Sequence, residues 1–123
     1  AIRMRYTGEF GWVGVAWQHP PNNWGKQEGG FDLTGAQELE LWARGEYGGE
    51  KINIGVGLIR DDQPHYDSAK KTVDDIVLTD QWQRYRISLK KLDLSSIKTG
   101  FVITLTGRRT PMTVYLDNIR YIR

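Results

Sequence analysis

The residues best suited to ligand chemistry in this chain are its tryptophans and the small residues near them. Trp42 lies between Glu38 and Leu58, in a segment whose second half carries Asn53 and two glycines. A sugar ring can lay its C–H face on an indole while its hydroxyls reach planar polar groups at the edge. Those available here are Arg44, Asn53, Glu46 and Glu50. The pattern predicts a trough that fits a sugar, although tryptophan covering glycine can also simply stabilise a sheet.

The same segment predicts a β-hairpin that would form this trough. Apolar residues alternate with polar ones from Leu39 to Ala43 and again from Ile52 to Leu58. If the residues 45–50 close a hairpin with Arg44 opposite Lys51, the apolar positions of both strands share one face. That register places Trp42 opposite Asn53 on the other face.

Trp24 is the strongest single candidate for a ligand platform. It lies in the loop 19–30, whose prolines, asparagines and glycines exclude regular structure, and its neighbours Asn23 and Gly25 are poor partners for burying an indole. The alternative is a tryptophan that closes the end of the fold. A second long polar loop, 59–72, carries Tyr66 and Asp67, and loops of this length usually serve a function.

The other tryptophans have plainer interpretations. In the segment 12–18, Gly14, Ala16 and Gln18 share a face with Trp12, so small residues again flank a tryptophan, while Trp17 shares the opposite face with valines and is expected in the core. Trp82 follows a turn and precedes a core alternation, so we expect it to be structural.

Several kinds of chemistry find little support in the sequence. The carboxylates of Glu46, Glu50 and Asp67 lie in turns or loops with nothing to position or desolvate them, so we expect no enzyme activity. His19 and His65 lack metal-ligand spacing, and the chain has no cysteine. The net charge is +2 with basic residues scattered along the sequence, and no apolar run reaches membrane-spanning length. We therefore expect neither nucleic acid nor membrane as a partner.

The composition indicates the fold class. Five Trp, six Tyr and fourteen Gly occur in a chain with no convincing amphipathic helix. About eight short strands at a spacing of about ten residues are typical of an antiparallel β-sandwich or jelly roll. We therefore predict a single all-β domain over residues 1–123.

Three segments resemble a known family. They are Leu-Glu-Leu-Trp-Ala-Arg-Gly-Glu at 39–46, Thr-Asp-Gln-Trp-Gln-Arg-Tyr-Arg-Ile-Ser-Leu at 79–89 and Val-Tyr-Leu-Asp-Asn-Ile-Arg-Tyr at 114–121. In this order they resemble strands of carbohydrate-binding modules with the galactose-binding-domain-like jelly roll, across nearly the whole chain. The resemblance implies a ligand on a concave face or loop edge, which implicates Trp24, Trp42, Arg44 and either Tyr66 or Asp67. It also implies a structural calcium at Asp117, although the chain lacks the earlier acidic strand of the family pattern.

We therefore expect a non-catalytic carbohydrate-binding module that binds polysaccharide or oligosaccharide and requires no cofactor, with calcium as the one structural ion that the resemblance implies. The resemblance also leads us to expect a module from a larger secreted bacterial protein that acts on carbohydrate, and Ala1 in place of an initiator Met suggests an excised module. The alternative is a structural or protein-interaction jelly roll whose aromatics only pack and whose open sheet edge mediates self-association.

Overall fold

Alternating apolar and polar residues produce eight strands and no helix in the parts of the chain that the computed structural model describes, residues 2–6, 12–21, 23–106 and 112–123. Residues on strands alternate between two faces, so each apolar series forms one buried face. The strands are β1 (Ile2–Tyr6), β2 (Trp12–Gln18), β3 (Glu38–Gly45), β4 (Lys51–Val56), β5 (Lys71–Val77), β6 (Gln83–Ser88), β7 (Thr99–Thr106) and β8 (Met112–Ile122).

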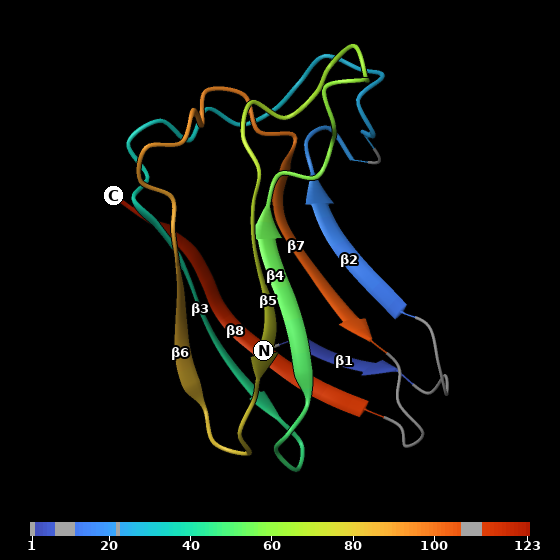
Figure 1. Cartoon of the computed structure of the whole chain (residues 1–123), viewed down its shortest axis with the longest axis vertical. Coiled ribbons are helices and arrows are strands. Elements are labelled where there is room, and N and C mark those ends of the chain that lie inside the picture. The colour runs from blue at the N-terminus through green and yellow to red at the C-terminus, as the bar shows by residue number, and fades with distance from the viewer. Residues whose placement is uncertain (1, 7–11, 22, 107–111) are drawn as a thin grey trace.

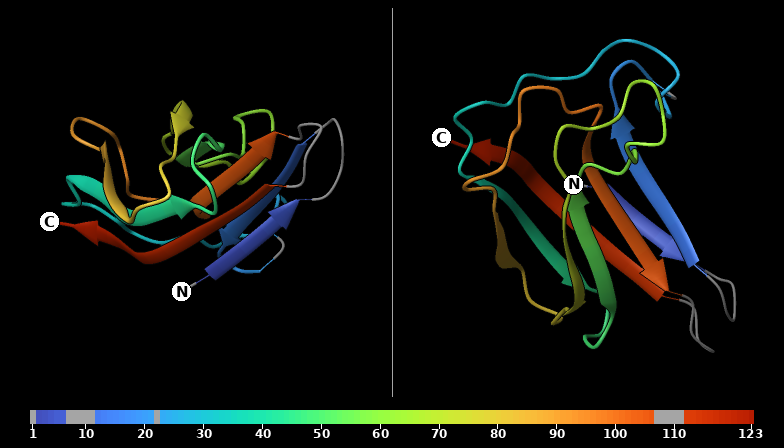
Figure 2. Two further views of the ribbon diagram at one scale, coloured as in Figure 1. Left: turned by 90° about the horizontal axis from the view of Figure 1, so that it is seen from below. Right: turned by 45° about the horizontal axis from the view of Figure 1, so that its top comes forward.

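The strands form two four-stranded antiparallel sheets that face each other (Figure 1, Figure 2). One sheet has the order β1-β8-β3-β6 and the other β2-β7-β4-β5. The prediction of an all-β antiparallel sandwich of about eight strands is therefore confirmed. Each sheet ends in two edge strands, and self-association through such an edge stays a prediction. Within the described ranges, no helix is long and apolar enough to cross a membrane.

The core lies between the two sheets. Leu39 and Leu41 of β3 point inward, and Ile54 of β4 meets them from the other sheet; all three are at most 1% exposed. On each strand, the residues that alternate with these inward-pointing ones point away from the partner sheet. We call these the outer faces, and any broad binding surface must lie on one of them or on a loop.

The expected hairpin between 38 and 58 is wrong. β3 pairs with β6 and β8, whereas β4 pairs with β5 and β7, so the two strands lie in opposite sheets. The segment that connects β3 to β4 forms hydrogen bonds instead with the residues that directly follow β5. The amide of Gly45 donates to Thr79 O at 2.8 Å, and that of Gly49 donates to Leu78 O at 2.7 Å. Gly48 and Gly49 have φ values of 94° and 88°, which glycine adopts without strain.

This correction also removes the predicted trough. Trp42 lies opposite Arg84 and Asp117, not opposite Asn53, because Asn53 belongs to the outer face of the other sheet. The apolar residues of β3 and β4 are buried between two facing sheets, and a single hairpin packed on a core would have buried the same residues.

Two long connections meet at one end of the sandwich. The segment after β2 and the segment after β4 lie side by side there, while the β3–β4 connection lies at the opposite end (Figure 1). The amide of His65 donates to Gly25 O at 2.8 Å, which ties the two connections together. This end of the molecule holds Trp24.

Candidate functional site

A groove of about 630 Å³ lies on the outer face of the β2-β7-β4-β5 sheet and ends at the loop that carries Trp24. A volume of this size is typical of small-ligand sites. The Trp24 side chain is 53% exposed, so the polar loop leaves the indole open to solvent. The lining residues are Gly14, Val15, Ala16, Trp17, Gln18, Pro21, Trp24, Leu58, Val102 and Thr104.

The floor of the groove is made of small residues on two neighbouring strands. Gly14 of β2 pairs with Thr104 of β7, and Ala16 pairs with Val102. Because none of these side chains is large, a flat ligand can approach the backbone of the sheet closely. The site therefore combines a shallow floor with an aromatic wall.

Asn23 holds the Trp24 wall in place. Its side chain is 1% exposed, and its Oδ1 accepts hydrogen bonds from the amides of Gly25 at 3.0 Å and Gln27 at 3.3 Å. Its Nδ2 donates to the carbonyl oxygens of Gln27 at 3.0 Å and His19 at 3.3 Å. A side chain with four such bonds fixes its loop, so Asn23 positions Trp24, and a direct ligand contact at Asn23 stays a prediction.

The loop between β4 and β5 packs against the loop that carries Trp24. Gly25 has a φ of 96°, and a Cβ at this position would lie 2.5 Å from Gln63 Cβ, so only glycine allows the two loops to pack this closely. Asp67 is almost fully buried, and its Oδ2 accepts hydrogen bonds from the amides of Leu58 and Ile59, both at 2.8 Å. Its Oδ1 accepts from the amides of Lys98 and Thr99. Asp67 therefore places Leu58 at the groove with both carboxylate oxygens used on backbone amides, and a ligand contact at Asp67 stays a prediction.

The polar groups at the groove are an amide and a hydroxyl. The Gln18 side chain lines it, and the Gln18 Nε2 is buried and has no hydrogen-bond partner among the described residues. A buried donor without a partner is costly, so this amide gains a partner if it turns toward the groove and donates to a ligand hydroxyl. Thr104 Oγ1 accepts a hydrogen bond from Asn53 Nδ2 at 3.0 Å, and Asn53 Oδ1 accepts one from the Asp75 amide at 2.9 Å. Asn53 therefore adjoins the site through Thr104.

The remaining predicted ligand residues lie elsewhere. Trp42 and Arg44 belong to the outer face of the opposite sheet, and Glu46 follows β3 in the connection between the sheets. Glu50 is fully buried in that connection, where its Oε2 accepts a hydrogen bond from the Tyr47 amide at 3.1 Å. Tyr66 is 48% exposed on the second loop but does not line the groove.

Asp117, the predicted calcium ligand, lies on β8 and accepts a hydrogen bond from the Asn118 amide at 2.9 Å. In the described part of the chain, no group of three or more His, Cys, Asp or Glu side chains is arranged so that it could hold a metal ion. A calcium site at Asp117 stays a prediction.

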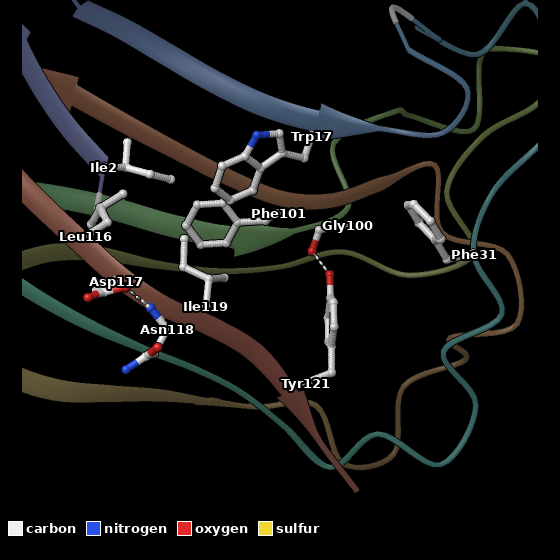
Figure 3. A pocket seen from close by; sticks show the side chains of 10 residues that line it. All are labelled: Ile2, Trp17, Phe31, Gly100, Phe101, Leu116, Asp117, Asn118, Ile119 and Tyr121. Carbon is white, nitrogen blue, oxygen red and sulfur yellow. Dashed lines mark hydrogen bonds between the residues drawn. The ribbon is translucent and has the colours of Figure 1, made fainter.

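A second hollow, of about 420 Å³, opens between the two sheets beside β1 and β2 (Figure 3). Trp17 stacks on Phe101 there with ring centroids 4.8 Å apart, and Ile119 lies below them, whereas Asp117 is at the margin. The expectation that Trp17 lies in the core is wrong, because 41% of it is exposed and it lines both this hollow and the groove. The Tyr121 hydroxyl donates to Gly100 O, and burial raises the pKa of Tyr121 to about 12. This hollow also has polar side chains, those of Asp117, Asn118 and Tyr121, but it is smaller than the groove and its indole is stacked on Phe101, so the groove beside Trp24 is the stronger candidate for a sugar site.

Of the ten residues that line the groove, the sequence-based prediction named only Trp24 as a ligand residue. It missed Gly14, Val15, Ala16, Trp17, Gln18, Pro21, Leu58, Val102 and Thr104. A signal for Gln18 was present, because it shares a strand face with Gly14 and Ala16. No local signal was available for the two β7 residues, since their place beside β2 depends on pairing between distant strands.

The family described as carbohydrate binding domain 30 matches residues 2–123. No curated protein sequence matches the chain.

Solved structures share the fold. The family 30 carbohydrate-binding module of the cellulosomal cellulase Cel9D-Cel44B of Clostridium thermocellum matches with 21% identity and a TM-score of 0.65, over 98% of this chain and 72% of that one. Another family 30 carbohydrate-binding module matches with 20% identity and a TM-score of 0.58, over 98% of this chain and 75% of that one. A third such structure is 23% identical, with a TM-score of 0.57, over 89% of this chain and 58% of that one. At these identities the likeness shows a shared sandwich fold.

Proposed function

This chain belongs to the carbohydrate binding domain 30 family, and from this membership we propose that the groove beside Trp24 binds an extended β-linked glucan chain. The family consists of binding modules, so the chain is a non-catalytic carbohydrate-binding module and not an enzyme. The alternative of a structural domain without a sugar ligand loses its basis.

One observation carries the assignment of the site: the exposed Trp24 indole stands at the end of a strip of sheet whose floor carries only small side chains. The pyranose rings of a β-1,4-linked glucan have flat C–H faces and equatorial hydroxyls. One ring can stack on Trp24, while the strip beside Gly14 and Ala16 lets the chain approach the backbone. Gln18 and Thr104 are then within the same groove to bond hydroxyls at its edge.

One structural relative is a module of a cellulosomal cellulase, which supports a glucan as the ligand class. We propose that this chain is likewise attached to a larger, secreted protein that acts on carbohydrate and keeps that protein on its polymer. Shallow sites that order a flexible chain bind weakly, and we expect Kd values between about 1 μM and about 1 mM, or roughly −8 to −4 kcal/mol.

Affinity gel electrophoresis against a panel of soluble polysaccharides tests this proposal. We expect β-1,4-linked glucans to retard the protein and Trp24→Ala to remove most of that retardation. Tyr47→Ala is the matched control, because Tyr47 is 77% exposed but lies in the β3–β4 connection, at the far end of the sandwich. Failure of every β-glucan to retard the wild-type protein would overturn the proposal.

We propose that binding requires no cofactor. EDTA should leave glucan binding unchanged, even if calcium at Asp117 contributes to stability. A rise in Tm on adding calcium that disappears in Asp117→Asn would identify such a structural ion.

A further inference from the structure

Arginines that are scattered in the sequence gather on the outer face of the β1-β8-β3-β6 sheet. The four strands contain six arginines and three carboxylates, whereas the four strands of the other sheet contain two lysines and two aspartates. The first sheet is therefore net positive and the second neutral. The arginines are Arg3, Arg5, Arg44, Arg84, Arg86 and Arg120, and the carboxylates are Glu38, Glu40 and Asp117. These arginines alternate with inward-facing residues such as Ile87, so all six belong to the outer face.

One buried carboxylate organises three of these arginines. Glu40 is 1% exposed, and its Oε1 accepts hydrogen bonds from Arg120 Nε at 3.1 Å and Arg120 Nη2 at 2.9 Å. Its Oε2 accepts from Arg86 Nε at 3.0 Å and lies 3.9 Å from Arg84 Nε. Burial raises the pKa of Glu40, but the hydrogen bonds and charges of Arg120 and Arg86 outweigh it, so the pKa lies below its ordinary value. Glu40 therefore stays ionised.

The arrangement leaves positive charge facing solvent. A single carboxylate cancels one of three guanidinium charges, and the three arginine side chains are between 45% and 65% exposed. Glu38 lies 3.8 Å from Arg86 and offsets part of the remaining positive charge. Guanidinium groups held in place lose little freedom when they bind a carboxylate, and their geometry suits bidentate contact.

An indole lies beside this cluster. Trp42 follows Glu40 by two residues on the same face of β3 and is paired with Arg84 on β6. Two hollows flank it: one of about 340 Å³, lined by Trp42, Asn118, Ile119 and Arg120, and one of about 210 Å³, lined by Trp42, Trp82, Asp117 and Asn118. The first hollow therefore joins an aromatic surface to an arginine within one space.

Nearby, Arg44 is engaged with aromatic rings. Its guanidinium lies 4.2 Å from the centroid of Tyr115 and 5.6 Å from that of Trp82. This contact fixes the Trp82 ring, which lines the second hollow together with Trp42, and leaves the Glu40 cluster as the main charge available to a ligand.

We propose that this outer face is a second carbohydrate site, one that takes an acidic polysaccharide whose sugars carry carboxylates. The pyranose ring lies against Trp42, and its carboxylate binds the guanidinium groups of Arg120 and Arg84. The site lies on the opposite side of the sandwich from the groove beside Trp24 and does not depend on the function proposed for that groove. The module would then hold a neutral glucan on one face and an acidic glycan on the other.

The test compares sodium polygalacturonate with its methyl ester, which has the same rings without the charge, by affinity electrophoresis and titration calorimetry. The wild-type protein should bind the acid and bind its ester at least about tenfold more weakly. Raising the salt from about 20 mM to about 200 mM should weaken binding of the acid several-fold. Trp24→Ala should bind the acid as the wild type does, which separates this site from the groove.

A charge-matched pair of variants distinguishes a site from a general basic surface. Arg84→Gln/Arg120→Gln should weaken polygalacturonate binding at least about tenfold, and Arg3→Gln/Arg5→Gln, which removes the same charge at the β1 edge, about threefold or less. If circular dichroism shows that the Arg84→Gln/Arg120→Gln variant does not fold, the single variants Arg84→Gln and Arg3→Gln are compared instead. Arg84→Gln should then bind polygalacturonate several-fold more weakly than Arg3→Gln. Arg84 makes only the 3.9 Å contact with Glu40, so its loss disturbs the cluster least.

Four results would overturn the proposal. They are no binding of polygalacturonate at low salt, equal binding of the ester, equal losses in the two charge-matched variants, or tighter binding of single-stranded DNA than of the acid.

Discussion

Replacing Trp24 by alanine removes the exposed wall of the groove, and the expected loss of affinity follows from the area involved. A tryptophan side chain offers roughly 250 Å², so an exposed fraction of 53% leaves roughly 130 Å² available to a ligand. A pyranose ring that covers about half of this removes about 65 Å² from water, or about 1.6 kcal/mol at about 25 cal/mol per Å². Trp24→Ala should therefore weaken glucan binding about 15-fold, and more where the sugar's own C–H face adds to the buried area.

Titration calorimetry with a soluble β-1,4-linked glucan measures this loss, with Tm as the check on folding. The exposed indole makes little contribution to the core, so Tm should fall by about 3 °C or less. Tyr47→Ala, the matched control at the other end of the sandwich, should bind as the wild type does. Unchanged affinity in Trp24→Ala, or an equal loss in Tyr47→Ala, would refute the reasoning.

Four further predictions concern the groove, its supporting loops and pH. Gln18→Leu keeps the side-chain volume but removes the amide, so calorimetry should show glucan affinity about fivefold to tenfold lower with Tm maintained. Asn23→Ala removes four loop hydrogen bonds and should lower both Tm and affinity, whereas a fall in neither would contradict its positioning role. Asp67→Asn replaces a carboxylate oxygen that accepts backbone amides by a donor, so denaturant unfolding should show a loss of about 2–3 kcal/mol. Tyr121 has a raised pKa of about 12, so its stabilising effect is complete below the ordinary value of 10 and is lost as the pH rises from 10 towards 12. Thermal unfolding of Tyr121→Phe should lack that part of the alkaline loss, and identical alkaline curves for the two proteins would contradict it.

The strands could be predicted from the sequence because their cause is local. The alternation from Leu39 to Ala43 and from Ile52 to Val56 determines which residues are buried, and the observed strands follow it closely. Alternation does not determine which strand is the neighbour. The residues 45–50 looked suited to a hairpin, but their amides bond Leu78 and Thr79 instead and carry the chain into the other sheet.

The candidate site could be predicted only where its cause is local in the sequence. Trp24 was recognisable because its loop has too few apolar neighbours to bury an indole. Asn23 and Asp67 were recognised as important, but the sequence could not show that their polar atoms would all be used on backbone groups. The arginine face depends wholly on pairing, since β6 and β8 bring Arg86 and Arg120 to Glu40 from 46 and 80 residues away.

The most direct test of the groove as the glucan site is a two-dimensional ¹H–¹⁵N NMR titration that follows the five tryptophan indole signals. Adding a β-1,4-linked gluco-oligosaccharide should shift the Trp24 indole together with the backbone amides of Ala16, Gln18 and Val102. The Trp42 indole, on the opposite face, should stay in place. Shifts at Trp42 without shifts at Trp24, or no shifts at millimolar ligand, would contradict the placement of the site.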